Sequence, residues 1–180
     1  MLPTIDYFTK QMHAPPHFHG QGAVKIMLKN GERWNFYADI EPVFVMLPHD
    51  HRVSFRSKVM KGQLKHVLYD VTDAGDEVTG LSQVVNDCDG TDARMVLPNC
   101  HMRKTMEMVH SAGQEYWIDR TQVHEVFLDS PKAITCINWT EGKKPDCLFV
   151  VEKDAPWVCA FSQPKHITRL WDVIRYCLES

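Results

Sequence analysis

The sequence predicts an all-β protein, built as an antiparallel sandwich or barrel with a helix near each end. Three observations predict this class. About ten short runs rich in β-branched and aromatic residues follow one another along the chain. Groups of Gly, Asn, Asp and Pro separate these runs, and only the two ends show helical periodicity. Many short strands with frequent turn signals are typical of sandwiches and barrels.

Residues 3–12 predict a short first helix with Thr4 as its N-cap. Pro15 and Pro16 cannot continue that helix. The segment His17-Phe18-His19 follows in this Pro-rich arm without a strand pattern around it. We therefore interpret it as an exposed or packing segment rather than a metal site.

The strand pattern begins with a hairpin, because Ala23–Lys29 and Arg33–Asp39 flank the turn-forming pair Asn30-Gly31. Val53–Met60 then alternates, so that every second side chain from Val53 onward shares one face. The further expected strands are Pro42–Leu47, Leu64–Val71, Glu77–Val85, Met102–His110, Glu115–Ile118, Val123–Leu128, Ala133–Trp139 and Leu148–Val151.

His166–Ser180 predicts a C-terminal amphipathic helix, because its apolar residues recur at steps of three and four. This helix should dock on the outside of the β body. A chain of 180 residues has the size of one domain. We expect a single domain over 1–180, with an N-terminal arm (1–21), a barrel (22–151) and a C-terminal helical segment (152–180).

The composition excludes several classes of function. With 20 Lys and Arg against 23 Asp and Glu, the formal net charge is −3, which argues against a nucleic-acid binder that works through bulk positive charge. No apolar stretch reaches the roughly 20 residues of a membrane span, and the N-terminus carries no secretory signal pattern. The six cysteines include no CxxC pair. We expect buried thiols in a cytoplasmic protein.

The segment His49-Asp50-His51 is the centre of the functional argument. On a strand, residues two apart point to the same side, so the two imidazoles would lie side by side as ligands of one metal ion. The spacing of this pair resembles the first motif of the cupin superfamily, with Gly62 at the motif's glycine position and Phe55 at its glutamate position.

The second cupin motif is matched in part. Gly113 and His124 stand at the motif's separation, whereas its proline, glycine and asparagine positions hold Asp119, Thr121 and Leu128. The resemblance covers roughly residues 22–151. It implies a double-stranded β-helix (the cupin or jelly-roll barrel), a metal held by His49, His51 and His124, and an inserted hairpin at about residues 73–110.

A ligand set of three histidines without a carboxylate resembles the thiol dioxygenases related to cysteine dioxygenase. This resemblance implies a divalent metal, most of all iron(II), with nickel, zinc or manganese as alternatives. Those enzymes carry a Ser-His-Tyr trio where this sequence has Thr135, Ile137 and Trp139, which argues against cysteine as the substrate. The sequence also resembles uncharacterised small cupins of phages and bacteria, which carry no known activity.

Five residues are candidates for substrate binding. Phe55 and Ser57 should share the barrel face of the two paired histidines by alternation. Arg33, Tyr69 and Tyr116 are candidates for the pocket mouth, where the fork of Arg33 would suit a carboxylate.

We therefore expect an iron(II)-dependent dioxygenase that acts on a small anionic or thiol substrate. One alternative is a cupin without turnover that binds a small molecule or has a structural role. Another is a sugar isomerase or epimerase, which needs a His base opposite a Tyr acid; His66 and Tyr69 would lie on opposite faces of their strand. Neither a nucleic acid nor a membrane is an expected partner. Family resemblance implies a homodimer.

Overall fold

A computed structural model describes residues 2–19, 23–40, 47–84, 94–140, 146–152 and 167–179. The strand expected at Pro42–Leu47 lies outside these residues, except for its last position. Within the described residues, no helix is both long enough and apolar enough to cross a membrane.

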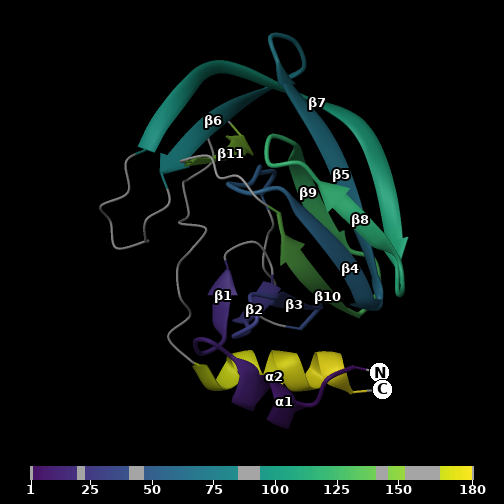
Figure 1. Ribbon diagram of the computed structural model, residues 1–180. Coiled ribbons are helices and arrows are strands. Elements are labelled where there is room, and N and C mark those ends of the chain that lie inside the picture. Colours follow the sequence, from purple (N-terminus) through teal and green to yellow (C-terminus); the bar gives the residue numbers. More distant parts are fainter. Residues whose placement is uncertain are drawn as a thin grey trace.

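The elements confirm a mostly β protein with a helix at each end (Figure 1). In chain order they are α1 (Ile5–Gln11), β1 (His17–His19), β2 (Ala23–Met27), β3 (Arg33–Ala38), β4 (Phe55–Lys61), β5 (Gln63–Thr72), β6 (Asp76–Val84), β7 (Arg94–Ser111), β8 (Glu115–Ile118), β9 (Val123–Leu128), β10 (Lys132–Trp139), β11 (Asp146–Glu152) and α2 (Ile167–Leu178).

The strands form two antiparallel sheets, ordered β1-β2-β3-β10-β4-β8 and β11-β6-β7-β5-β9. A backbone bridge between His49 and His124 places the segment 47–51 beside β9. The pairs are nested in the sequence, because β3 pairs with β10, the segment 47–51 with β9, β4 with β8 and β5 with β7. Successive pairs lie alternately in one sheet and the other. This order is the double-stranded β-helix, or jelly roll.

The inserted hairpin expected at about residues 73–110 is formed by β6 and β7. The first half of β7 pairs with β6 and its second half pairs with β5, so this single strand belongs to both the insertion and the barrel. In Figure 1, β7 is a long curved strand that runs along the top of the molecule and down its right side. The strand β11 covers the free edge of β6.

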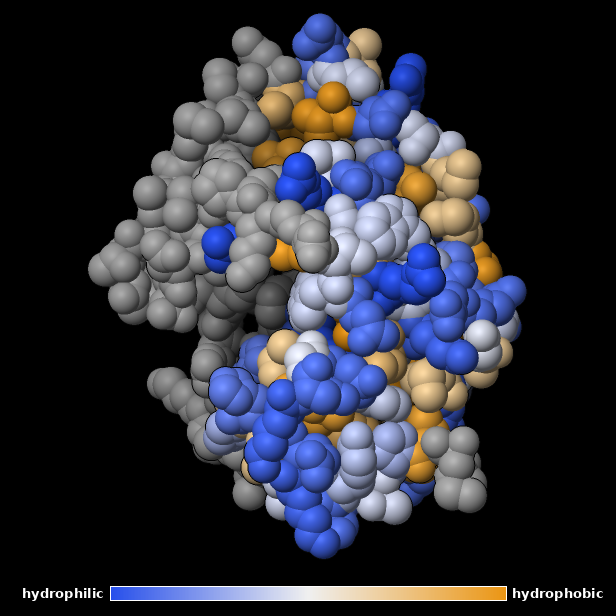
Figure 2. All heavy atoms as spheres, viewed as in Figure 1, coloured by the Kyte–Doolittle hydropathy of each residue, from blue (hydrophilic) through white to orange (hydrophobic). Residues whose placement is uncertain are grey.

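The helices cover the outer face of the β1-β2-β3 edge. The N-cap prediction is confirmed, because the Thr4 side chain accepts a hydrogen bond from the amide of Tyr7. One apolar cluster joins both helices to β2, β3 and β10; it contains Phe8, Val24, Ile26, Leu28, Trp34, Phe36, Ile134, Cys136, Leu170, Val173, Ile174 and Cys177. Hydrophilic side chains cover the helices in the lower part of the face shown in Figure 2, as amphipathic helices require.

Lys132 also secures α2. Its ammonium group donates to the carbonyls of Tyr176 and Glu179, at 3.0 and 2.9 Å, and so satisfies the unpaired carbonyls at the helix C-terminus.

Two local expectations need correction. The segment His17–His19 is a short strand paired with β2, so the arm joins the sheet edge. The hairpin loop between Leu28 and Glu32 has three residues rather than two, with Gly31 in the left-handed region at φ 89°. A turn followed by a left-handed glycine is a common alternative to the two-residue hairpin.

The histidine pair is also not on a continuous strand. His49 forms one bridge with His124, and regular pairing resumes only at Phe55. The interruption follows from the topology. The segment 47–51 pairs with β9 in one sheet and β4 pairs in the other, so the chain must cross between the sheets at residues 52–54.

Candidate metal centre

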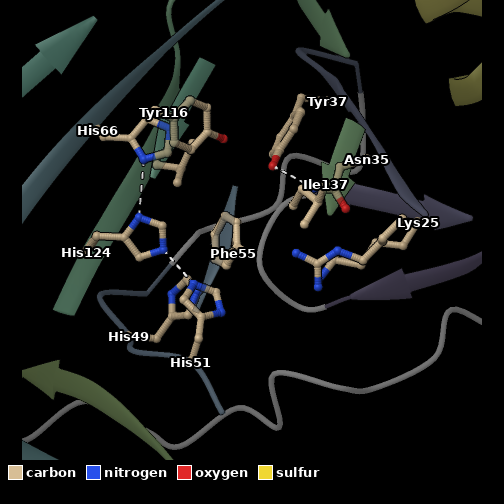
Figure 3. Close-up of a pocket in the computed structure, with 13 residues that line it drawn as sticks. Lys25, Asn35, Tyr37, His49, His51, Phe55, His66, Tyr116, His124 and Ile137 are labelled. Carbon is tan, nitrogen blue, oxygen red and sulfur yellow. Dashed lines mark hydrogen bonds between the residues drawn. The ribbon is translucent and has the colours of Figure 1, made fainter. Parts of the chain in front are cut away.

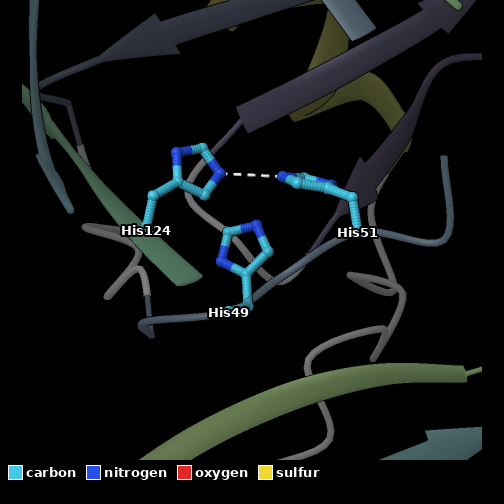
Figure 4. Close-up of side chains that lie close together, drawn as sticks. All are labelled: His49, His51 and His124. Atoms are coloured by element: carbon cyan, nitrogen blue, oxygen red, sulfur yellow. Dashed lines mark hydrogen bonds between the residues drawn. The ribbon is translucent and has the colours of Figure 1, made fainter. Parts of the chain in front are cut away.

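Three imidazole rings meet inside the barrel, those of His49, His51 and His124 (Figure 4). One ring nitrogen from each lies within 4.8 Å of the others. The ring centres are 4.7 to 4.9 Å apart, and the Nε2 atoms of His51 and His124 are 2.7 Å apart. The histidine pair and the distant third histidine predicted from the sequence are therefore brought together.

Backbone hydrogen bonds fix the positions of the three residues. His49 and His124 exchange both amide-to-carbonyl bonds, at 2.9 and 2.8 Å, which puts their side chains on the same side of the bridge. The amide of His51 donates to the carbonyl of Arg120 at 3.2 Å. Asp50, which lies between the two histidines in the sequence, is buried. Its carboxylate accepts a hydrogen bond from the amide of Leu148 at 2.7 Å, which connects this segment to β11.

Two further contacts orient the rings. The Nδ1 atom of His49 lies 2.8 Å from the carbonyl oxygen of Leu47, so Nδ1 is the protonated nitrogen and the lone pair of the ring is on Nε2. The Nδ1 atom of His124 lies 3.2 Å from Nδ1 of His66, and the two rings stack. With Nε2 of His124 as a ligand, its Nδ1–H donates to His66. This is the outer hydrogen bond that metal-binding histidines usually make.

The charge state also suits a metal. Burial lowers the pKa of His49 to about 3, and burial together with the neighbouring histidines lowers the pKa of His51 well below its usual range. Burial lowers the pKa of His124 in the same way. All three rings are therefore neutral near pH 7, and the neutral ring is the form that binds metals.

The spacing of the nitrogens is close to that of a shared ion. Two imidazole nitrogens bound at about 2.1 Å and at right angles lie about 3 Å apart. The 2.7 Å between Nε2 of His51 and Nε2 of His124 is only slightly shorter. The donor set and its spacing fit a divalent metal ion, so the cluster can hold one.

A shallow pocket opens to solvent beside the three histidines (Figure 3). Its lining comes from both sheets and comprises Ala23, Lys25, Arg33, Asn35, Tyr37, His49, His51, Phe55, His66, Tyr116, His124, Val126 and Ile137. None of these is a carboxylate, and two are cations. The pocket therefore has a positive potential even without a metal.

Phe55 stands at the position where the motif resemblance would place a carboxylate. It is buried, with its ring centre 4.7 Å from that of His51 and 6.5 Å from that of His124. A phenyl ring thus forms an apolar wall beside the imidazoles, in the position that the motif gives to a fourth ligand.

The other candidate substrate-binding residues lie in different places. Arg33 and Tyr116 line the pocket. Ser57 is completely buried next to it, and its hydroxyl lies beside the hydroxyl of Tyr116. Tyr69 is outside the pocket and needs correction. It packs against another apolar cluster, and its hydroxyl donates to Glu125 at 2.9 Å.

Sequence reasoning missed Lys25, Asn35 and Tyr37, which face the same pocket. A signal for them exists in the hairpin. Lys25 alternates with apolar neighbours in β2, and Asn35 and Tyr37 alternate with the buried Trp34 and Phe36 in β3. His66, weighed in the sequence only as an isomerase base, instead contacts the ligand His124.

No family model and no curated protein matches this sequence. Solved structures that resemble it include the cupin domain of Drosophila melanogaster CENP-C, at 9% identity over 66% of this chain and 70% of that chain, with a TM-score of 0.33. Hydroquinone 1,2-dioxygenase from Sphingomonas sp. TTNP3, with 4-hydroxybenzoate bound, has 11% identity over 72% and 68%, with a TM-score of 0.32.

Peruvianin-I, a cysteine peptidase from Thevetia peruviana latex, has 16% identity over 84% of this chain and 82% of that chain, with a TM-score of 0.36. All three TM-scores are low. The assignment of the jelly roll therefore rests on the strand order rather than on these likenesses.

Proposed function

We propose that this protein is a metal-dependent dioxygenase that uses iron(II) and acts on a small anionic or thiol substrate. The observation that carries this proposal is the convergence of three neutral imidazoles, with no carboxylate among them, at the wall of a pocket lined by cations.

The absence of a carboxylate ligand determines the charge of the site. Three neutral imidazoles leave a divalent ion with its full positive charge, whereas a glutamate at the position of Phe55 would reduce it by one. A bound ion is the largest local charge in such a site, so it favours a carboxylate or a thiolate. The positive potential from Lys25 and Arg33 acts in the same direction.

Each group in the site has a defined task. The three histidines hold the metal, and three protein ligands leave an octahedral ion with up to three positions for other molecules. Iron(II) held there would supply the redox chemistry that lets dioxygen react with the substrate, and oxidation of the substrate would provide the electrons. His66 holds the ring of His124 through the contact between their Nδ1 atoms. Phe55 keeps water from one side of the histidines, and Arg33 offers two parallel donors to a carboxylate.

Oxygen consumption by iron-loaded protein tests the proposal. Thiols, diketones and oxo-acids are supplied in turn under an oxygen electrode, and the double variant His49→Ala/His51→Ala is the control. We expect uptake with one class of substrate and none with the variant. Wild-type protein that holds metal but consumes no more oxygen than the variant would favour a binding cupin without turnover.

Elemental analysis tests the metal site separately. Stoichiometric metal in the wild type and its loss in both His49→Ala and His124→Ala are expected. Metal retained in either variant would contradict the three-histidine site.

A further inference from the structure

We infer that the substrate of the proposed metal site is a small dianion: one anionic group sits at the three histidines, and a second, separate one is held by Lys25 and Arg33. This inference rests on the proposed function and extends it by naming the class of substrate, such as a hydroxy- or mercapto-dicarboxylate.

The two cations belong to one surface of the hairpin. In the register of β2 and β3, Lys25 lies opposite Asn35 and Met27 lies opposite Arg33. Lys25 and Arg33 are therefore diagonal neighbours on the face that lines the pocket. The alternate residues of both strands pack against the helices instead.

In the described part of the chain, the group that favours the charged form of Lys25 is the thiol of Cys147, not a carboxylate. Among the residues that the structure describes, the ion pairs involve other groups, and no carboxylate pairs with Lys25 or Arg33. Only 4% of Lys25 is exposed. Burial and the charge of Arg33 lower the pKa of Lys25 well below its usual range, and burial lowers the pKa of Arg33 to about 10. Two adjacent buried cations are costly unless an anion joins them.

Polar atoms without partners lie next to these cations. The Nε atom of Arg33 is buried and has no hydrogen-bond acceptor. The side chain of Asn35 is buried; its nitrogen donates to Thr135 at 3.1 Å and to Tyr37 at 3.3 Å, and its oxygen accepts nothing. Buried polar groups are normally satisfied, so the unpaired Nε donor of Arg33 indicates a bound acceptor such as a carboxylate, and the unpaired oxygen of Asn35 indicates a donor such as a hydroxyl group.

Phe55 separates this anion site from the histidines. Its ring centre lies 5.9 Å from the guanidinium carbon of Arg33 and 4.7 Å from the ring centre of His51. Figure 3 shows Phe55 between the histidines on one side and Lys25, Asn35 and Tyr37 on the other. Arg33 is also held in place by the ring of Trp139, at 4.2 Å. A single carboxylate cannot occupy both places, but a short molecule that is charged at each end can.

A matched pair of ligands tests this inference without oxygen chemistry. Malate and 2-hydroxybutanoate have the same four-carbon chain and the same hydroxy-acid end. At the other end malate carries a carboxylate, whereas 2-hydroxybutanoate carries a methyl group. Both are titrated calorimetrically into zinc-loaded protein, because zinc has no redox chemistry. The metal content of every sample is measured first.

We expect the wild type to bind malate at least about tenfold more tightly than 2-hydroxybutanoate, because a hydrogen bond between charged groups contributes enough free energy for that difference in affinity. Lys25→Met and Arg33→Gln should each remove most of this preference and change the affinity for 2-hydroxybutanoate less than about twofold. Arg33→Lys, which keeps the charge, should retain part of it. Lys58→Met is the control, because Lys58 is exposed on β4 and pairs with Glu115.

Equal affinity of the wild type for the two ligands overturns the inference, as does a variant that weakens both alike. Protein that takes up no zinc would instead contradict the proposed function. In that case the same titrations on metal-free protein decide the inference. Binding of malate that Arg33→Gln weakens and Lys58→Met preserves supports it, and binding that is indifferent to Arg33→Gln overturns it.

Discussion

Acid should destabilise the metal-free protein through its buried histidines. The pKa of His49 falls from an ordinary 6.5 to about 3 in the folded state, because burial disfavours the charged ring. Below pH 6.5, His49 therefore binds a proton in the unfolded chain but not in the folded chain. The free energy of unfolding decreases as the pH falls, and this continues until the pH reaches the folded pKa.

The size of the effect follows from the pKa. Each pH unit between the two pKa values costs about 1.36 kcal/mol, so lowering the pH from 7.5 to 5.0 removes about 2 kcal/mol through His49 alone. His51, His66 and His124 act in the same direction, because burial lowers the pKa of each. A domain with a typical stability of about 5–15 kcal/mol is sensitive to such a loss.

Urea unfolding of the metal-free protein at pH 7.5 and pH 5.0 measures this loss. In His49→Gln the change between the two pH values should be smaller than in the wild type by about 2 kcal/mol. His13→Gln is the matched control, because that side chain is exposed. If His49→Gln and the wild type lose equal stability on acidification, the reasoning about a neutral buried ring is refuted.

Three further substitutions test the packing around the site. Phe55→Glu puts a carboxylate beside His51 and should raise the affinity for zinc at least about tenfold in a chelator competition. The buried charge should lower the stability of the metal-free protein by about 2 kcal/mol. An unchanged zinc affinity would show that residue 55 does not reach the ion. Gly62→Ala should cost about 2–3 kcal/mol in urea unfolding, because φ is 73° and a Cβ would collide with the carbonyl of Lys132; a neutral result would contradict this conformation. Ser57→Ala should cost about 1 kcal/mol in urea unfolding, because the buried hydroxyl pairs with that of Tyr116, and an equal or higher stability of the variant would show that the two hydroxyls do not pair.

The parts of the fold with one buried face could be predicted from the sequence. In β4, buried Phe55, Ser57 and Val59 alternate with exposed Arg56 and Lys58. This two-residue alternation of apolar and charged side chains predicts a strand with one buried face. The spacing of the histidines predicted their cluster in the same way, because the double-stranded β-helix brings the two segments that carry them together. Short-range patterns and motif spacing are properties of the chain itself.

The proposed anion site could not be predicted in this way, because β2 is buried on both faces. Val24 and Ile26 pack against the helices, and Ala23 and Lys25 line the pocket. A lysine in a strand is normally interpreted as facing solvent. Only the docking of α2 on the opposite face reveals that this lysine points inward. The expectation for Tyr69 failed for a related reason. The packing of the two sheets decides which face of β5 lines the pocket, and the sequence of β5 alone does not show this packing.

The bridge between His49 and His124 has a consequence for how the proposed metal site would acquire an ion. His51 and His124 are separated by 73 positions in the chain, so a growing polypeptide offers only a bidentate pair until β9 has emerged and paired. Tight uptake then coincides with barrel closure, and the amides shared by the bridge should exchange with solvent far more slowly once an ion is held. Binding of the ion by His124, the last of the three histidines in the chain, would thus stabilise the closed barrel.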